Sequence, residues 1–263
     1  MPTPIGNLGD ITLRALEVLK NVDIVFSEDT RSTLKLFNHY NIKKPIKSFH
    51  KDNELKTIDT VLQYIKDGKS VAIVSEAGMP CISDPGSVLT NRLSEEKIDF
   101  QVLPGATALT VALLKSGFPT NNFYFKGFLS HKKNDKLNEI EYLKSINSTI
   151  IVYESPHRIK ETLFLLFKNF DKICVLRELT KIYEEKIYIN SEEDIENIIL
   201  KGEFVIVIDN NYKEETETTK YNPLKLIEKL KQEKFSNKDI LSLMKVLGFK
   251  RNEIYPLLTD FKE

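Results

Sequence analysis

The first part of the chain alternates between short apolar runs and longer segments of helical periodicity. The runs Val22–Ser27 and Ser70–Ser75 indicate buried strands. Between them, Asn53–Gly68 repeats apolar residues every three or four positions and ends in a glycine, as an amphipathic helix does. Further helices are expected over Asp10–Asn21 with Asp10 as N-cap, Ser87–Glu96 and Ala106–Gly117, and a further strand over Asp99–Gly105. Strands that alternate with helices in this way predict a parallel sheet covered on both faces.

The pattern changes from about residue 118 onward. Two strand-like segments, Lys172–Leu179 and Lys181–Ile189, are separated by a single residue, which is too short for a crossover helix. These two strands should therefore be antiparallel, and this part of the chain should contain a mixed sheet. The other strands are expected over Phe123–Ser130, Thr149–Ser155 and Glu203–Asp209, with helices near Asp135–Ser145, Pro156–Asn169 and Ser191–Leu200.

The last part of the chain is different again. Residues 211–222 are polar and without periodicity, which is typical of a linker. Short helices follow, with Pro223 in a first turn, Ser236 as a cap and Gly248 as a stop. We therefore expect an α/β protein with a cofactor cleft between two α/β domains. The expected parts are an N-terminal domain at 1–118, a second domain with a mixed sheet at 119–210, a linker at 211–222 and a helix-turn-helix-like module at 223–263.

Composition excludes several classes of protein. The chain is 41% hydrophobic and 29% charged, which is typical of a globular protein. No apolar run approaches the roughly 20 residues of a membrane helix, and the first ten residues lack a signal-peptide core, so we expect a cytoplasmic protein without a membrane partner. Neither Cys81 nor Cys174 has a Cys or His at metal-ligand spacing, so no metal is expected. Because 38 basic residues balance 38 acidic ones, a nucleic-acid partner would need a local basic patch.

Five loops combine Gly, Pro or carboxylates at places where a ligand could bind. In an open parallel sheet, ligands bind beyond the carboxyl ends of the strands. The loops are "TPIGNLGD" (3–10), "EDTR" (28–31), "EAGMPCISDPG" (76–86), "PGATA" (104–108) and "YESPHR" (153–158). Any one of them is more simply explained as a turn, and Asp84 as a helix cap. Five such loops at equivalent positions favour a shared ligand site instead.

The motifs exclude two common nucleotide sites and favour another kind of ligand. Neither G-x-x-x-x-G-K-[ST] nor G-x-G-x-x-G occurs, so a P-loop and a dinucleotide fingerprint are both unsupported. The small residues of the loops would let the backbone approach a ligand and leave an apolar slot between them. Such a site suits an adenosine that carries a charged amino-acid tail.

These five motifs, in this order and spacing, resemble the bacterial methyltransferases of the tetrapyrrole methylase superfamily that act on a cytidine ribose of small-subunit ribosomal RNA. The resemblance covers nearly the whole chain. It implies S-adenosyl-L-methionine as methyl donor, a homodimer, and 16S rRNA within the small ribosomal subunit as partner. The implied reaction is 2′-O-methylation of a cytidine near the decoding centre.

The resemblance also implies which residues contact the cofactor. They are Pro4, Gly6, Ala77, Gly78, Met79, Ile82, Thr107, Ala108, Tyr153 and Glu154. Many relatives have Asp and Thr where this chain has Glu76 and Met79. A backbone contact at Met79 would survive that difference, whereas a hydroxyl contact would not.

The residue types leave the catalytic base open. Glu28, His50 and Asp84 are candidates to take the proton of a ribose hydroxyl, and Arg31 or Arg158 could hold a phosphate. The basic residues Lys126, His131, Lys132, Lys133 and Lys136 could guide an RNA strand, as could the C-terminal helices, although both groups could also be ordinary solvated surface. Two alternatives remain: a methylase of a small tetrapyrrole-like substrate, and a non-catalytic RNA-binding or ribosome assembly protein.

The family enters its first loop from a strand, whereas this sequence reaches that loop directly at Met1–Thr3. Either the true start lies upstream, or the parallel sheet lacks one strand and the first cofactor loop is poorly anchored. For the chain as written we expect low stability. Adding a strand-forming segment before Met1 should raise the melting temperature measured by scanning calorimetry. Equal melting temperatures with and without the segment would contradict this expectation.

Overall fold

The computed structural model describes residues 1–211, 222–247, 249 and 251–259. The chain divides into two compact units, Met1–Asn210 and Asn211–Glu263. The expected boundary between residues 118 and 119 falls inside the first unit, between α5 and β4. Most of the expected linker, and Gly248 as a helix stop, lie outside the described residues.

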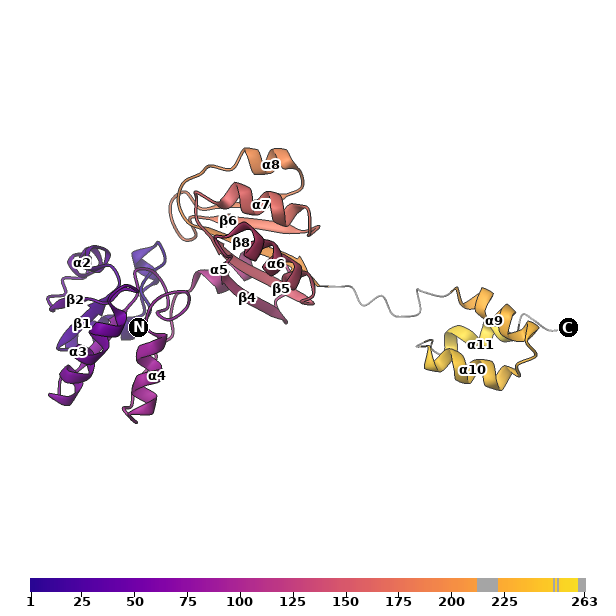
Figure 1. Ribbon diagram of the computed structural model, residues 1–263, viewed down its shortest axis with the longest axis horizontal. Helices are drawn as coiled ribbons and strands as arrows, with labels where there is room; N and C mark the ends of the chain where they lie inside the picture. Colours follow the sequence, from indigo (N-terminus) through magenta and orange to yellow (C-terminus); the bar gives the residue numbers. More distant parts are fainter. Residues whose placement is uncertain (212–221, 248, 250, 260–263) are drawn as a thin grey trace. The chain divides into compact units, whose positions relative to one another are not determined.

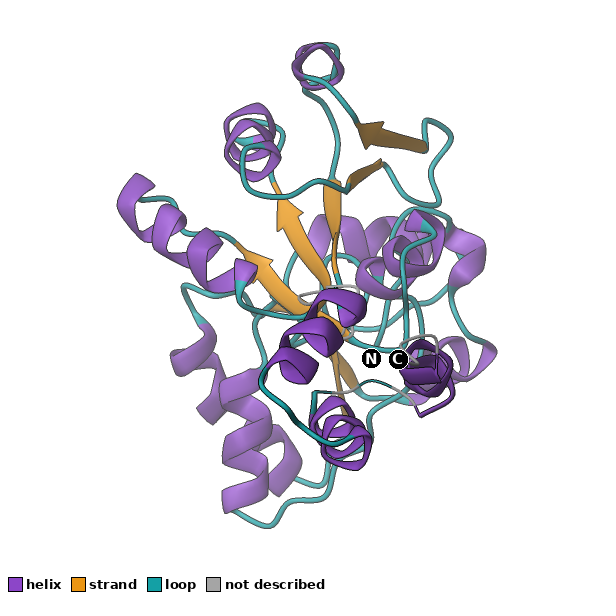
Figure 2. Ribbon diagram, turned by 90° about the vertical axis from the view of Figure 1, so that its right-hand side faces the viewer, coloured by secondary structure: helices purple, strands orange, loops and turns teal. Residues whose placement is uncertain are grey.

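The first unit begins with a three-stranded parallel sheet in the order β2-β1-β3. Its strands are β1 (Ile24–Ser27), β2 (Ile46–Ser48) and β3 (Val71–Val74), and its helices are η1 (Leu8–Asp10), α1 (Leu13–Asn21), α2 (Thr30–His39), α3 (Glu54–Lys66) and α4 (Ser87–Glu95). Alternate residues of β1 point to opposite faces: Val25 packs with α1 and α2, whereas Phe26 packs with α3 and α4. Both faces of this sheet are thus covered by helices, as a parallel sheet requires. Figure 2 shows the helices and strands of the chain in separate colours.

Two sequence expectations are wrong in this sheet. Asp99–Gly105 is not a strand. The reason is the lack of a ladder partner, because β3 is the edge of the sheet and no described strand pairs beside it. Asp10 does not cap α1; it ends η1, and the Thr12 hydroxyl caps α1 by accepting from the amide of Ala15 at 3.1 Å.

The second sheet has five strands in the order β4-β5-β8-β6-β7. The strands are β4 (Phe123–Phe128), β5 (Ser148–Glu154), β6 (Ile173–Arg177), β7 (Glu185–Ile189) and β8 (Phe204–Asn210). Only the β4–β5 pair is parallel, and β6 and β7 are antiparallel as predicted. The predicted α/β class, with one parallel and one mixed sheet, is confirmed.

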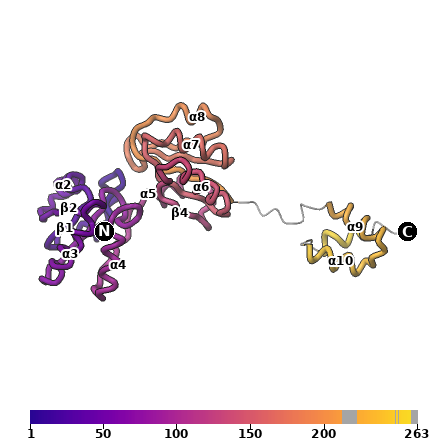
Figure 3. The backbone as a smooth tube through the Cα atoms, viewed as in Figure 1, coloured from indigo at the N-terminus to yellow at the C-terminus, as the bar shows by residue number. Residues whose placement is uncertain are grey.

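Helices cover both faces of the second sheet as well. One face packs against α6 (Lys133–Lys144), α7 (Ile159–Phe167) and α8 (Glu192–Glu196). The other face packs against α5 (Ala108–Ser116) and Ile5 of the first loop. Within this sheet α5 lies mainly against β8 and β6, and Figure 3 labels α5 in the part of the first unit that leads into β4. A helix that precedes residue 118 thus belongs to the packing of the second sheet.

The second unit contains α9 (Pro223–Gln232), α10 (Asn237–Val246) and α11 (Arg251–Thr259) around a core of its own (Figure 1). Ile227, Ile240 and Met244 are fully buried in this core. Asn222 caps α9 with Pro223 in the first turn, and Ser236 caps α10, as predicted. The sequence therefore sets the ends of these helices locally.

This separate core makes a thermodynamic prediction. Ile240→Ala should destabilise the second unit by about 2–4 kcal/mol, because it leaves a cavity in the core of that unit. Scanning calorimetry of the full chain should show a lower transition for that unit and an unchanged transition for the first. Leu243→Ala, at a side chain that is 40% exposed, is the control and should shift neither transition much. Equal shifts of both transitions by Ile240→Ala would contradict the division.

Candidate active site

A cavity of about 350 Å³ lies within the first unit, where loops from both sheets meet. This volume is within the range of about 300–1,000 Å³ that is usual for small-molecule sites. Its wall is formed by Ile5, by Glu28 after β1, by the loop after β3, by the start of α5, by the end of β5 and by the start of β8. The cavity thus lies at the carboxyl ends of β1, β3 and β5.

The loop between β3 and α4 owes its shape to backbone conformations that few residues adopt. Gly78 has φ +84° and Gly86 has φ +126°, and Cys81 and Ser83 also have positive φ. Gly78 forms an antiparallel bridge with Thr3, with N···O distances of 2.9 and 3.1 Å. Gly78 therefore folds this loop against the first loop, whereas Gly86 precedes α4 and donates its amide hydrogen to Glu54 Oε1 at 2.8 Å.

Eight of the ten expected cofactor residues line the cavity. They are Ala77, Gly78, Met79, Ile82, Thr107, Ala108, Tyr153 and Glu154. Pro4 and Gly6 instead line a neighbouring hollow that shares Ile5, Glu76 and Ala77 with it. Gly6 is needed for close packing there, because a Cβ would lie 2.6 Å from both Thr180 Oγ1 and Lys181 Cγ.

The cavity is acidic. Glu28, Glu76, Asp84 and Glu203 all line it. Burial, followed by the charges of Glu28 and Glu76, raises the pKa of Asp84 to about 7. Burial and neighbouring carboxylates, Asp29 first among them, also raise the pKa of Glu76. The site therefore favours a ligand that carries positive charge.

The structure separates the candidate bases. Glu28 and Asp84 line the cavity, and Glu28 also accepts a hydrogen bond from the Glu76 amide at 3.1 Å. His50 does not line the cavity; its amide donates to Asn53 Oδ1 in the turn before α3. Arg31 has an 87% exposed side chain that pairs with Asp29, and it is not part of the cavity wall either.

Tyr153 and Thr107 face one another across the cavity wall. Burial raises the pKa of the Tyr153 hydroxyl to about 12, so this group stays protonated at neutral pH. Thr107 Oγ1 is buried and makes no hydrogen bond of ordinary geometry within the described part of the chain, although the Tyr153 hydroxyl is a polar neighbour. The buried Thr107 hydroxyl is therefore available to a ligand, whereas the Tyr153 hydroxyl already has the Leu109 backbone and Thr107 as hydrogen-bonding neighbours.

Glu154 and Arg158 are engaged with each other. Arg158 Nη2 donates to Glu154 Oε2 at 2.9 Å and to the Leu129 carbonyl at 2.7 Å. The Glu154 side chain is fully buried, and its other oxygen accepts from the Ser155 amide. A phosphate contact at Arg158 stays a prediction that would require this pair to open.

Sequence reasoning missed part of the wall. Glu203 and Val205 reach the cavity because β8 runs antiparallel to β5, so the start of β8 lies beside the end of β5. Attention to carboxyl ends alone does not find such residues. The prediction for Lys136 is wrong for a different reason. This residue was expected on a basic surface, but it is only 1% exposed.

The cavity fits a cationic nucleoside on three observations: its size, its carboxylates and the unsatisfied hydroxyl of Thr107. The loops that build the cavity follow the carboxyl ends of strands. The protein therefore belongs to the class of α/β proteins that bind a small molecule at the strand ends. No group of three His, Cys, Asp or Glu residues that could hold a metal occurs among the described residues. Within those same residues, no helix is long and apolar enough to cross a membrane.

Comparisons with known proteins narrow this class. Residues 2–196 match the family model of Tetrapyrrole (Corrin/Porphyrin) Methylases. The ribosomal RNA small subunit methyltransferase I of Bacillus subtilis is 42% identical over 82% of this chain and 76% of its own length. The protein of the same name from Thermotoga maritima is 44% identical over 78% of this chain and 95% of its own.

Solved structures agree on the fold. A diphthine synthase aligns with a TM-score of 0.65 and 15% identity over 79% of this chain and 87% of that one. A cobalt precorrin-4 methyltransferase aligns with a TM-score of 0.59 and 17% identity over 80% and 93%. The chain belongs to the tetrapyrrole methylase family, among the relatives named ribosomal RNA small subunit methyltransferase I. At this level the prediction of S-adenosyl-L-methionine as cofactor is confirmed.

The raised pKa of Asp84 predicts how stability depends on pH. A carboxyl whose pKa is higher in the folded protein favours the folded state fully below about pH 4, and this contribution is lost as pH rises through about 7. Asp84→Asn removes the ionisable group, so the variant should not lose stability as the pH rises. At pH 8 it should be more stable than the ligand-free wild type by about 1–2 kcal/mol, after allowance for solvent screening. Melting temperatures at pH 5 and pH 8 measure this. Asp99→Asn, at an exposed carboxylate outside the cavity wall, is the control; equal effects of both variants would contradict the prediction.

Proposed function

We propose that this protein transfers a methyl group from S-adenosyl-L-methionine to the 2′-hydroxyl of a cytidine ribose in 16S rRNA, in the cytoplasm and near the decoding centre of the small subunit. The observation that carries this proposal is the acidic cavity at the strand ends, in a chain over 40% identical to relatives named for small-subunit rRNA methylation. The five sequence motifs that form the wall supply further support.

The cavity residues have distinct roles in this proposal. Carboxylates of Glu76 and Asp84 attract the positive charge of the cofactor, and the hydroxyls of Thr107 and Tyr153 orient it. When bound, the cofactor supplies an electrophilic methyl group. Holding the ribose oxygen in line with that methyl group is worth about 7–11 kcal/mol of the barrier.

We assign the role of general base, which takes the proton of the 2′-hydroxyl, to Asp84, with Glu28 beside it. Both carboxylates line the cavity, and the charge of the bound cofactor lowers the pKa of Asp84 from about 7, which keeps this carboxylate ionised and able to accept a proton at neutral pH. As the new C–O bond forms and the methyl leaves sulfur, the hydroxyl proton passes to the carboxylate. His50 is not part of the cavity wall, so no role follows for it.

Two features of the chain fit an RNA substrate and a dimer. The second unit is rich in lysines on α9 and α10, such as Lys225, Lys229 and Lys245, which suit phosphate contacts. On the first unit, Ile182 is 95% and Leu114 68% exposed, and the Lys115–Glu184 ion pair joins their two segments. Exposed apolar side chains of this kind suit a homodimer interface.

The decisive test is ribose-methylation mapping of 16S rRNA from cells that lack this chain. One 2′-O-methylcytidine should disappear and return with the wild-type protein. Asp84→Asn should lower the rate of methyl transfer by about 10²–10⁴-fold at saturating cofactor, because it removes the base. His50→Gln is the control and should stay near the wild-type rate. An unchanged methylation map would overturn the proposal, and wild-type rates for Asp84→Asn would place the base elsewhere.

The same material separates the two alternatives. A methylase of a small tetrapyrrole-like substrate would bind cofactor but leave the rRNA map unchanged. A non-catalytic RNA-binding or assembly protein would bind RNA and give no heat on titration with S-adenosyl-L-methionine.

A further inference from the structure

Lys136 is a charged residue in a place that normally excludes charge. It is on α6, its side chain is 1% exposed, and burying an ammonium group is costly unless it is well paired. Its partner Glu161, at 3.2 Å, has a side chain that is 60% exposed. An ion pair with so exposed a carboxylate contributes little, so stability alone does not explain a lysine at this position.

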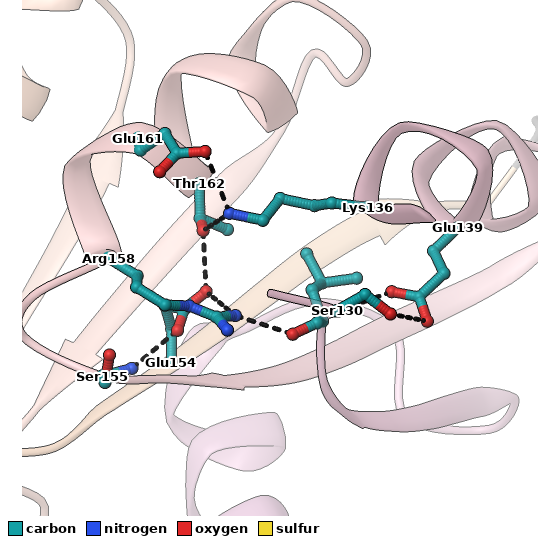
Figure 4. A network of polar contacts seen from close by, with 9 residues as sticks. Ser130, Lys136, Glu139, Glu154, Ser155, Arg158, Glu161 and Thr162 are labelled. Carbon is teal, nitrogen blue, oxygen red and sulfur yellow. Dashed lines mark hydrogen bonds and ion pairs between the residues drawn. The ribbon is translucent and has the colours of Figure 1, made fainter. Parts of the chain in front are cut away.

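The second partner of Lys136 is Thr162, which connects Lys136 to Glu154 of the cavity wall (Figure 4). Lys136 Nζ lies 3.4 Å from Thr162 Oγ1, and Thr162 Oγ1 lies 2.7 Å from Glu154 Oε2. An ammonium group can only donate and a carboxylate can only accept. The Thr162 hydroxyl must therefore accept from Lys136 and donate to Glu154, so the direction of this relay is fixed.

Glu154 connects Thr162 to the cavity wall. It ends β5, and its carboxylate also accepts from Arg158 Nη2 and, at 2.8 Å, from the amide of Ser155. Tyr153, Glu154 and Ser155 all line the cavity. The carboxylate thus fixes the backbone at the point where β5 leaves the sheet and forms the wall.

We propose that Lys136 and Thr162 are positioning residues that act through Glu154 to hold the Tyr153–Ser155 wall of the cavity in its ligand-binding shape. This proposal rests on the proposed function only for the identity of the ligand. Neither residue touches the cavity itself. Their effect on binding is therefore indirect, and it passes through a single carboxylate.

Substitutions separate this role from a purely structural one. Lys136→Met fills the same space without charge, so the melting temperature should stay equal or rise. S-adenosyl-L-methionine binding measured by calorimetry on the full chain should nevertheless weaken by about three- to tenfold, because a buried hydrogen bond is lost. Thr162→Val should weaken binding more than Lys136→Met does. Thr162→Ser keeps the hydroxyl and should bind with wild-type affinity. Lys133→Met, at an exposed lysine of the same helix, is the matched control.

The double variant tests the route of the effect. If Lys136 acts through Thr162, the combination of Lys136→Met with Thr162→Val should bind no more weakly than Thr162→Val alone. Additive losses would overturn the proposal, as would wild-type affinity for Lys136→Met.

A second readout does not depend on the ligand. Amide hydrogen exchange of the ligand-free protein should be faster in the segment that contains Ser155 for Lys136→Met and for Thr162→Val, and unchanged for Lys133→Met. Unchanged exchange in all variants would overturn the positioning role. If the wild type binds no cofactor but exchange responds as expected, the proposed function fails and the positioning role stands.

Discussion

The structure depends on one electrostatic constraint: negative charge gathered in a partly buried cavity, beyond the carboxyl ends of β1 and β3 and at the start of β8. Glu28, Asp84 and Glu203 come from separate segments of the chain, and the fold brings them together. Burial, followed by repulsion from Glu28 and Glu76, raises the pKa of Asp84, which reflects the cost of placing carboxylates there. A bound cation relieves the repulsion, which links the stability of this region to its ligand.

Contacts between loops hold these carboxylates in place. The Thr3–Gly78 bridge joins the first loop to the loop after β3, and Gly6 packs against Thr180 and Lys181 of the segment after β6. Both contacts require glycine: Gly78 for its positive φ, and Gly6 for space. A rigid wall made of loops is possible because each loop is fixed to another.

The sequence was most informative where local rules suffice. The pattern of apolar residues located α3, β1 and β3 but not β2, and Pro223 and Ser236 marked helix starts because capping involves neighbours in sequence. The family resemblance, rather than a local rule, located eight residues of the cavity wall. Asp99–Gly105 was wrong because a strand also needs a partner, which local pattern cannot supply. Lys136 was wrong because the burial of one lysine depends on tertiary packing.

The central claim is that the cavity binds a sulfonium nucleoside through its carboxylates. The most direct measurement is calorimetric titration at pH 7, in buffers of different ionisation enthalpy, with S-adenosyl-L-methionine and with its uncharged-sulfur product S-adenosylhomocysteine. The account predicts that both bind and that the sulfonium ligand releases more protons, because its charge lowers the pKa of Asp84 from about 7. Absence of binding by both, or equal proton release by the two ligands, would contradict it.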